Sequence, residues 1–149
     1  MKYDVRMGYL KDLPIVASLL SDFLKIEIDI IINFLLNNKI AVVVATVTRH
    51  KKEYVIGVST FNIKKEINGD DAIVGNYAYI DPNYRRKGLL IRMLKFIEAF
   101  ASANNIKKIY AGSNIPEPFY KMGYKKVHEI LMKEVLNDAI DPSIHHGAN

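Results

Sequence analysis

The residues with the clearest chemical potential lie in the stretch DPNYRRKGLLIRML, which begins at Asp81. Three consecutive cations, from Arg85 to Lys87, are followed by Gly88 and then by an apolar segment with helical spacing. The first turn of a helix has unpaired N–H groups and a partial positive charge, so it stabilises a bound anion. Glycine has no Cβ and lets a ligand approach the main chain. This cationic turn, residues 81–88, predicts a phosphate site and in particular a pyrophosphate site; the alternative is a solvated loop.

The amino-acid composition excludes several other kinds of chemistry. The chain has no cysteine, which excludes a disulfide framework, a thiolate zinc site and a cysteine nucleophile. Its four histidines are scattered or lie near the C-terminal end, so we expect no metal. The cationic turn matches neither a Walker loop nor the pattern GxGxxG, which makes ATP and NAD poor candidates. The formal net charge of +5 is compatible with a polyanionic partner, although excess lysine also serves solubility.

The length of the chain indicates one domain with its own core, since 149 residues leave little room for a second. We expect this domain to span residues 1–136, and residues 137–149, which lack periodicity, to form a flexible tail. No apolar stretch is long enough to cross a bilayer, and the first residues lack the apolar segment of a signal peptide. The expected location is therefore the cytoplasm, with no membrane partner.

The elements that position the cationic turn are indicated by hydrophobic periodicity. The chain begins with a strand pattern and then a helix pattern. Residues 26–37 begin with alternation typical of a strand, but a helical stripe favours a second helix. Three β-branched and aromatic runs separated by polar turns then predict a meander of three strands, whose last strand, residues 72–80, leads into the cationic turn.

The segment after the cationic turn has the strongest helical pattern in the chain. Its apolar stripe consists of Leu90, Met93, Leu94, Ile97, Phe100 and Ala101. Residues 106–112 then predict a short strand, residues 116–123 at most two turns of helix, and residues 124–135 one strand or two. The order β-α-α-β-β-β-α-β-α-β(-β) predicts an α+β or mixed α/β domain with a sheet covered by helices.

Two segments resemble the GNAT N-acetyltransferases. YIDPNYRRKGLLIRMLKFIEAF is similar to the acyl-CoA-binding segment of that family, which has an apolar residue, Pro two residues on, Arg or Gln, two residues, Gly, any residue, and Gly or Ala. The corresponding positions are Ile80, Pro82, Arg85, Gly88, Leu89 and Leu90, with Leu90 in place of the small residue. IKKIYAGSNIPEPFYKMGYKK resembles the family's strand, Asn, short helix, FY, Gly and aromatic block. The likeness covers nearly the whole chain.

This resemblance implies an α+β, sandwich-like fold with a mixed, mostly antiparallel central sheet flanked by helices. It also implies direct transfer of an acetyl group from acetyl-CoA, the cosubstrate, to a primary amine, without a metal. The CoA pyrophosphate would lie on the amides and cations of residues 85–90, and the pantetheine arm would pair with the end of the preceding strand. The implied cofactor-binding residues are Tyr79, Ile80, Arg85, Arg86, Lys87, Gly88, Leu89, Leu90 and Asn114. Asn114 alternatively only caps the segment that follows it.

The resemblance also implies a tyrosine that donates a proton to the departing thiolate, and Tyr120 is the candidate. The family usually has this tyrosine four residues before the Gly, where this chain has Phe119, so Tyr120 is alternatively a core aromatic residue. We assign no general base. Family members that act on protein amino termini often carry a Glu where this chain has Ile109, and Glu117 is explained by the helix dipole alone.

Three classes of function remain open on the sequence alone. The first is an N-acetyltransferase whose acceptor is a small amine or a protein amine; Tyr77 and Tyr79, on one strand face, either line its acceptor groove or are ordinary strand residues. The second is a non-catalytic acyl-CoA-binding regulatory module of the same fold, favoured by the shifted tyrosine, the missing base and Leu90. A nucleic-acid binder ranks last, because no nucleic-acid-binding motif is present. The resemblance is also compatible with a homodimer.

Overall fold

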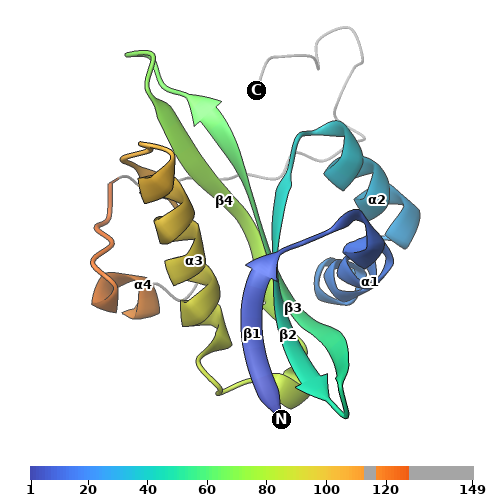
Figure 1. Cartoon of the computed structure of the whole chain (residues 1–149). Helices are drawn as coiled ribbons and strands as arrows, with labels where there is room; N and C mark the ends of the chain where they lie inside the picture. The colour runs from blue at the N-terminus through green and yellow to red at the C-terminus, as the bar shows by residue number, and fades with distance from the viewer. Residues whose placement is uncertain (113–116, 128–149) are drawn as a thin grey trace, which may run out of the picture. The chain divides into compact units, whose positions relative to one another are not determined.

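A computed structural model describes residues 1–112 and 117–127, which fall into two units, Met1–Ser113 and Asn114–Asn149. The first unit contains a five-stranded sheet and three α-helices (Figure 1). The described part of the second unit contains one short helix. The segment that resembles an acyl-CoA-binding motif, residues 79–100, belongs entirely to the first unit, and the candidate tyrosine belongs to the second.

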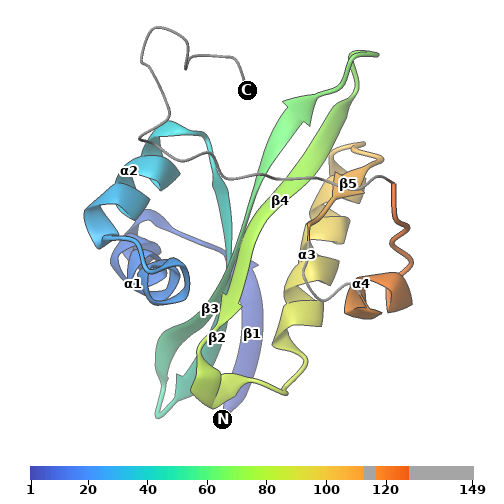
Figure 2. The ribbon, with the colours of Figure 1, turned by 180° about the vertical axis from the view of Figure 1, so that it is seen from behind.

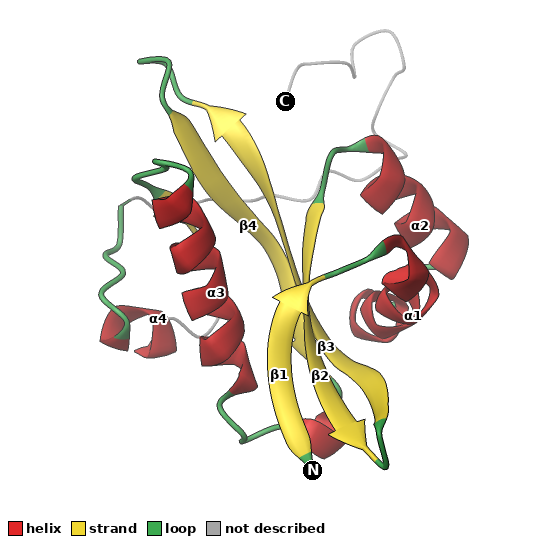
Figure 3. Cartoon of the chain, viewed as in Figure 1, coloured by secondary structure: helices red, strands yellow, loops and turns green. Residues whose placement is uncertain are grey.

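The sheet has the strand order β1-β2-β3-β4-β5, so neighbours in the sheet follow the order of the chain. The strands are β1 (Lys2–Met7), β2 (Ala41–Arg49), β3 (Lys52–Lys65), β4 (Asp71–Ile80) and β5 (Ile109–Tyr110). The first four are antiparallel to one another, and β5 is parallel to β4. The predicted three-strand meander and the predicted mixed, mostly antiparallel sheet are both confirmed (Figure 3). The predicted strand over residues 106–112 is reduced to two residues.

Helices cover both faces of this sheet. A 3₁₀ turn leads into α1 (Leu13–Leu24), which is followed by α2 (Ile28–Asn37), and these two helices lie on one face. The opposite face is covered by α3 (Leu89–Ala103), as Figures 1 and 2 show. The ambiguous segment 26–37 is mainly helical because Ile31 and Leu35, one turn apart, are both buried. The alternation at its start does not reflect strand packing.

Two apolar cores separate the helices from the sheet. The core under α3 contains the predicted stripe: Met93, Leu94, Ile97 and Ala101 are buried, and Leu90 and Phe100 are partly buried. The core under α1 and α2 includes buried residues of both helices and of the strands β2 and β3. The side chains of the sheet therefore alternate between an α3 face and an α1/α2 face, and the α1/α2 face carries Tyr79.

An ion-pair network fastens β1 to the start of α1. Arg6 of β1 donates to Asp12 Oδ2 at 2.7 Å and to Glu53 Oε1 of β3 at 2.7 Å. Asp12 also accepts a hydrogen bond of 2.7 Å from the Tyr9 N–H, and only 5% of the residue is exposed. The Arg6 hydrogen bond lowers the pKa of Asp12 below its ordinary range, so the carboxylate stays ionised well below neutral pH.

A second polar contact holds β5 beside the hairpin that joins β3 to β4. The Tyr110 hydroxyl donates to Glu66 Oε2 at 2.7 Å, and Lys108 Nζ lies 3.4 Å from Glu66 Oε1. Next to this contact, the Ile73 N–H of β4 donates to the Lys108 carbonyl at 3.0 Å. The short strand is therefore anchored by side chains as well as by the ladder.

The described part of the second unit contains α4 (Glu117–Lys121), which confirms the expected short helix. Gly123 ends it with a φ of 94°, and the Tyr124 N–H donates to the Phe119 carbonyl at 3.0 Å. Residues 124–127 do not form a strand, contrary to the expectation for residues 124–135. The rest of that expected strand lies outside the described residues.

Candidate functional site

The cationic turn reverses the chain directly after β4. The Asp81 N–H donates to the Ile56 carbonyl of β3 at 2.8 Å, which keeps Asp81 on the sheet. Its side chain then accepts a hydrogen bond of 2.9 Å from the Asn83 N–H and so caps a 3₁₀ turn, Pro82–Tyr84. This turn delivers the residues that follow to the beginning of α3. The strand, the turn and the helix therefore form one continuous support for a ligand.

The beginning of α3 has no side-chain cap. The Arg92 N–H makes the first backbone hydrogen bond of the helix, to the Gly88 carbonyl at 3.1 Å. Within the part of the chain that the structure describes, the N–H groups of Leu89, Leu90 and Ile91 have no acceptor. Such groups stabilise an anion, as the sequence predicted for this position.

The conformation of the turn explains its glycine. Gly88 has a φ of 73°, a left-handed backbone that residues with a Cβ rarely adopt. A Cβ built at Gly88 would meet nothing within 4 Å, so the space around it is open. Arg86 has a φ of 64° and is exposed, as is Lys87. The turn thus places two exposed cations beside the uncapped N–H groups.

The two leucines of the motif use their side chains for packing. Leu89 is 2% exposed and belongs to the core under α3, and Leu90 is partly buried against that core. Only their main-chain N–H groups remain for a ligand. The apolar side chain at Leu90, where the family pattern has a small residue, therefore packs inward on the helical stripe.

Arg85 differs from the other two cations of the turn. Its Nε donates to the Ile80 carbonyl at 2.9 Å, and its guanidinium carbon lies 5.2 Å from the centre of the Tyr79 ring. The Tyr79 ring in turn stacks on Phe23 of α1, with ring centres 5.1 Å apart and an interplanar angle of 19°. Arg85 is therefore held against the α1/α2 face of the sheet, whereas α3 covers the other face.

The second half of β4 has an open edge. β5 pairs with Ile73 and Val74 only, so within residues 1–112 and 117–127 no strand borders β4 beyond them (Figure 2). Along an antiparallel strand the main-chain N–H and C=O groups of successive residues point alternately toward one neighbouring strand and away from it. Because the Asp81 N–H donates to β3, the main-chain groups of Tyr79 also point toward β3, and those of Ala78 and Ile80 point toward the open edge. Of the two strand residues that the sequence predicted, Ile80 has its main-chain groups on the open edge and Tyr79 does not; Ala78, on the edge, was not among the predicted residues.

A β-bulge at Asn76 precedes this edge. Thr60 pairs with Tyr77 and Phe61 with Gly75, which leaves Asn76 without an opposite residue. Bulges bend and twist a strand, so the bulge turns β4 away from the line of its first half. The Tyr77 N–H donates to Thr60 Oγ1 at 3.1 Å.

The bulge also places a polar side chain on the α1/α2 face. Asn76 Nδ2 donates to Asn62 Oδ1 at 3.1 Å. Asn76 Oδ1 is buried and has no hydrogen-bond partner among the residues that the structure describes. A buried acceptor without a donor is costly, which makes this oxygen a candidate contact for an N–H group.

Aromatic side chains line the same face. Tyr77 lies edge-on to Phe34 of α2, with ring centres 6.4 Å apart, as Tyr79 stacks on Phe23 of α1. Tyr77 is 37% exposed and Phe23 is 42% exposed. The prediction that the two tyrosines share one face is confirmed, and their role toward an acceptor stays a prediction.

The candidate proton donor belongs to the second unit. Tyr120 of α4 is 47% exposed, and its neighbour Phe119 packs edge-on against Tyr124 with ring centres 5.4 Å apart. Within this short helix Phe119 makes the aromatic contact, and the Tyr120 side chain is left accessible. Asn114, the other residue predicted there, lies outside the described residues.

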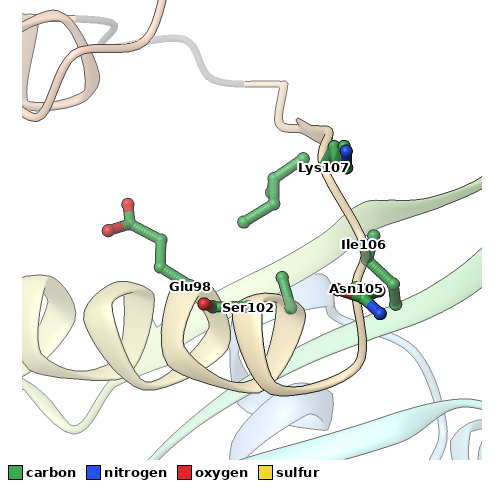
Figure 4. A pocket seen from close by; sticks show the side chains of 7 residues that line it. Glu98, Ser102, Asn105, Ile106 and Lys107 are labelled. Carbon is green, nitrogen blue, oxygen red and sulfur yellow. The ribbon is translucent and has the colours of Figure 1, made fainter.

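A hollow of about 350 Å³ lies elsewhere in the first unit, at the C-terminal end of α3 (Figure 4). Glu98 and Ser102 of the helix and the segment from Asn105 to Lys107 line it. The cationic turn is at the opposite end of this 15-residue helix, about 22 Å away along its axis. The hollow therefore does not belong to the candidate site.

Two features are absent from residues 1–112 and 117–127. None of the helices among them is long and apolar enough to span a bilayer. No group of three His, Cys, Asp or Glu side chains among them is arranged to hold a metal ion.

Comparison with protein families identifies the architecture. The model of the acetyltransferase (GNAT) family matches residues 18–124, which is more than half of the chain. The chain belongs to the GNAT family. The match extends from α1 to Tyr124 and so includes the open edge of β4, the cationic turn and α3.

Solved acetyltransferase structures share the fold of this chain. It aligns with an acetyltransferase from Trypanosoma brucei at 19% identity and a TM-score of 0.71, over 91% of this chain and 100% of that one. Glucosamine-6-phosphate N-acetyltransferase from Arabidopsis thaliana gives 15% identity and a TM-score of 0.70, over 92% and 100%. A predicted acetyltransferase from Clostridium acetobutylicum, crystallised with acetyl-CoA, aligns at 20% identity and a TM-score of 0.66, over 89% of this chain and 96% of that one. At such identities the likeness shows the fold alone, and no curated protein matches the chain.

Proposed function

We propose that this GNAT chain transfers an acetyl group from acetyl-CoA directly to a primary amine. The observation that carries the proposal is the continuity of the open edge of β4 with the uncapped, cationic beginning of α3. Such a surface suits a ligand with an extended amide-bearing arm at one end and a diphosphate at the other. Membership of the family supports acetyl-CoA as that ligand.

The diphosphate is proposed to lie on the N–H groups of Leu89 and Leu90, beside Arg86 and Lys87. Helix N–H groups and full positive charges both stabilise a bound anion. Gly88 supports this contact because its left-handed backbone sets the direction of the first N–H groups of α3.

The pantetheine arm is proposed to pair with the open edge as an added strand does. Ala78 and Ile80 offer the main-chain groups for this pairing. The Ile80 carbonyl already accepts from Arg85 Nε, but a carbonyl oxygen has two lone pairs and can accept a second N–H.

The proposed reaction joins the amine nitrogen to the acetyl carbon and breaks the bond from that carbon to sulfur. The amine must be neutral to attack, and one proton leaves its nitrogen as the amide forms. The departing thiolate takes a proton, for which Tyr120 is the proposed donor because its side chain is exposed. The residues of β4 include no carboxylate apart from Asp71 at its distant start, so no general base is assigned.

The test combines coenzyme binding with turnover. Calorimetry measures the affinity of the purified chain for coenzyme A, and a thiol reagent follows coenzyme A release during incubation with acetyl-CoA and a panel of amines. The chain has no cysteine, so the reagent reports only on the released coenzyme. Absence of binding at millimolar coenzyme A overturns the proposal.

A second function is favoured by one observation: Phe119 occupies the expected tyrosine position and packs against Tyr124. A non-catalytic acyl-CoA-binding module would bind coenzyme A in the calorimeter and release none from acetyl-CoA with any amine. The same two measurements therefore separate the two functions.

A further inference from the structure

We propose that the acceptor is an amine that carries an apolar group and no second positive charge, and that this apolar group packs on the exposed rings of Phe23 and Tyr77. The inference rests on the proposed function and adds to it a class of acceptor. It starts from four aromatic side chains on the α1/α2 face of the sheet, Phe23, Phe34, Tyr77 and Tyr79, which we call the aromatic wall.

The aromatic wall joins one strand to two helices. The ring of Tyr79 stacks on Phe23 of α1, and the ring of Tyr77 lies edge-on to Phe34 of α2. The two tyrosines share a face of β4, on the side of the sheet that α1 and α2 cover (Figure 2). Tyr79 and Phe34 are partly buried against the core under these helices. The rings are therefore held in place by protein contacts before any ligand binds.

Two rings of the aromatic wall remain open to solvent. Tyr77 is 37% exposed, and Phe23 is 42% exposed although it stacks on Tyr79. Apolar surface gains free energy when it is removed from water, and a ring placed against another ring gains more. A ligand with an aromatic or branched aliphatic group would make both gains here, whereas a small hydrophilic amine would make neither.

The aromatic wall lies beside the part of β4 that the acetyl group is proposed to reach. The pantetheine arm leaves the diphosphate at the beginning of α3 and is proposed to pair first with Ile80 and then with Ala78. The acetyl group at the end of the arm then lies near Ala78, which Tyr77 and Tyr79 flank. An amine that attacks this group from the α1/α2 face places its remaining atoms against the rings.

The charges near the aromatic wall disfavour an acceptor with a second cation. The residues opposite Tyr77 and Tyr79 in the ladder are Thr60 and Val58, and neither has a carboxylate. The guanidinium carbon of Arg85, one of the implied cofactor-binding residues, lies 5.2 Å from the centre of the Tyr79 ring. This fixed positive charge repels another one nearby. An amine with a neutral apolar group therefore fits the surface better than a polyamine does.

The test compares acceptors that differ in the apolar group. Phenethylamine and ethylamine form one pair, and phenylalaninamide and glycinamide form the other, so that a free amine is distinguished from an amino terminus. For the wild-type chain we expect kcat/KM to be about tenfold higher for the apolar member of at least one pair. Putrescine tests the second charge, and we expect its kcat/KM to be no higher than that of ethylamine.

Four variants connect this preference to the aromatic wall. Phe23→Ala and Tyr77→Ala each remove one exposed ring, and we expect each to reduce the preference about threefold or more, while kcat/KM for ethylamine and the Kd for coenzyme A stay within about twofold. Tyr77→Phe keeps the ring and should keep the preference. Tyr54→Ala is the matched control, since Tyr54 of β3 is 38% exposed but lies outside the aromatic wall. If Tyr77→Ala does not fold, Phe23→Ala supplies the test.

Three outcomes overturn the inference. The first is a wild-type chain that acetylates both members of each pair equally well or prefers putrescine, which would leave the proposed function intact. The second is an equal loss of kcat/KM for both members of a pair in Phe23→Ala and Tyr77→Ala. The third is a similar loss of preference in Tyr54→Ala. Failure of coenzyme A to bind, or binding without turnover of any amine, overturns the proposed function and this inference together.

Discussion

Replacement of Gly88 by alanine tests the link between backbone conformation and coenzyme binding. Gly88 has a φ of 73°, and a Cβ there would contact nothing within 4 Å. The cost of the substitution is therefore conformational and not steric. A left-handed backbone costs an alanine about 1 kcal/mol more than a glycine.

This conformational cost lowers either the stability of the chain or its affinity for coenzyme A, and the two quantities are measured separately. If the turn keeps its shape, the free energy of unfolding falls by about 1 kcal/mol, which lowers the Tm of a chain of this length by about 3 °C. If the turn relaxes, the first N–H groups of α3 lose their alignment on the diphosphate. Hydrogen bonds to charged groups contribute about 1.5–3 kcal/mol, so partial loss weakens coenzyme A binding about tenfold.

Gly69→Ala is the matched control for this experiment. Gly69, in the hairpin between β3 and β4, has a φ of 90° and open space around it as well. We expect the turn at Gly88 to relax, so that Gly88→Ala loses less stability than Gly69→Ala in thermal denaturation and also loses affinity in calorimetry, whereas Gly69→Ala keeps its affinity. A smaller loss of stability in Gly88→Ala without a loss of affinity for coenzyme A would refute the assignment of the diphosphate to this turn.

Three further changes have expected outcomes. Tyr120→Phe should lower kcat about 100-fold with little change in coenzyme affinity, and unchanged turnover would remove this hydroxyl from the mechanism. Replacing Arg86 and Lys87 together by Gln should weaken coenzyme A binding and reduce its dependence on salt; calorimetric salt slopes parallel to those of the wild type would contradict this. Asp12→Asn should lower the free energy of unfolding by about 3 kcal/mol at neutral pH, because it breaks a buried ion pair, whereas the exposed Asp4→Asn should cost less than about 0.5 kcal/mol. Because the pKa of Asp12 is lowered in the folded chain, the stability that the carboxylate contributes is complete above the ordinary pKa of 3.8 and is lost as pH falls through the lower folded value. Between about pH 7 and about pH 2, the free energy of unfolding measured by urea denaturation should therefore decline less for Asp12→Asn than for the wild type.

Much of the fold could be predicted from the sequence because it depends on local periodicity. The meander, the helical stripe of α3 and the helix–turn–strand order all follow from which side chains are apolar and at what spacing. The beginning of α3 was also predictable, since Gly88 and the apolar residues after it mark a helix start. Of the strand expected over residues 124–135, the described residues 124–127 do not form one, because alternation does not by itself supply a partner strand.

The details of the candidate site depend on contacts between segments that are distant in sequence. The side of β4 that Ala78 faces follows from its register with β3 and from the bulge at Asn76, and neither has a clear local signal. The separation of Arg85 from its two cationic neighbours likewise requires the ring of Tyr79, held by Phe23 of α1. The one available hint was the bulky aromatic residue at Tyr79, directly before the last residue of the strand.

The bend in β4 depends on a single residue, the bulged Asn76. The ladder between β3 and β4 runs from Phe61 opposite Gly75 to Thr60 opposite Tyr77, so a chain without Asn76 would keep every one of these cross-strand partners. Both hydrophobic cores would also keep their side chains, since the inward and outward positions on either side of the deletion already alternate correctly. Only the bend between the first and second halves of β4 would disappear. The open edge of β4 follows the bulge, so one inserted amino acid sets the direction of the strand segment with which the proposed coenzyme arm would pair.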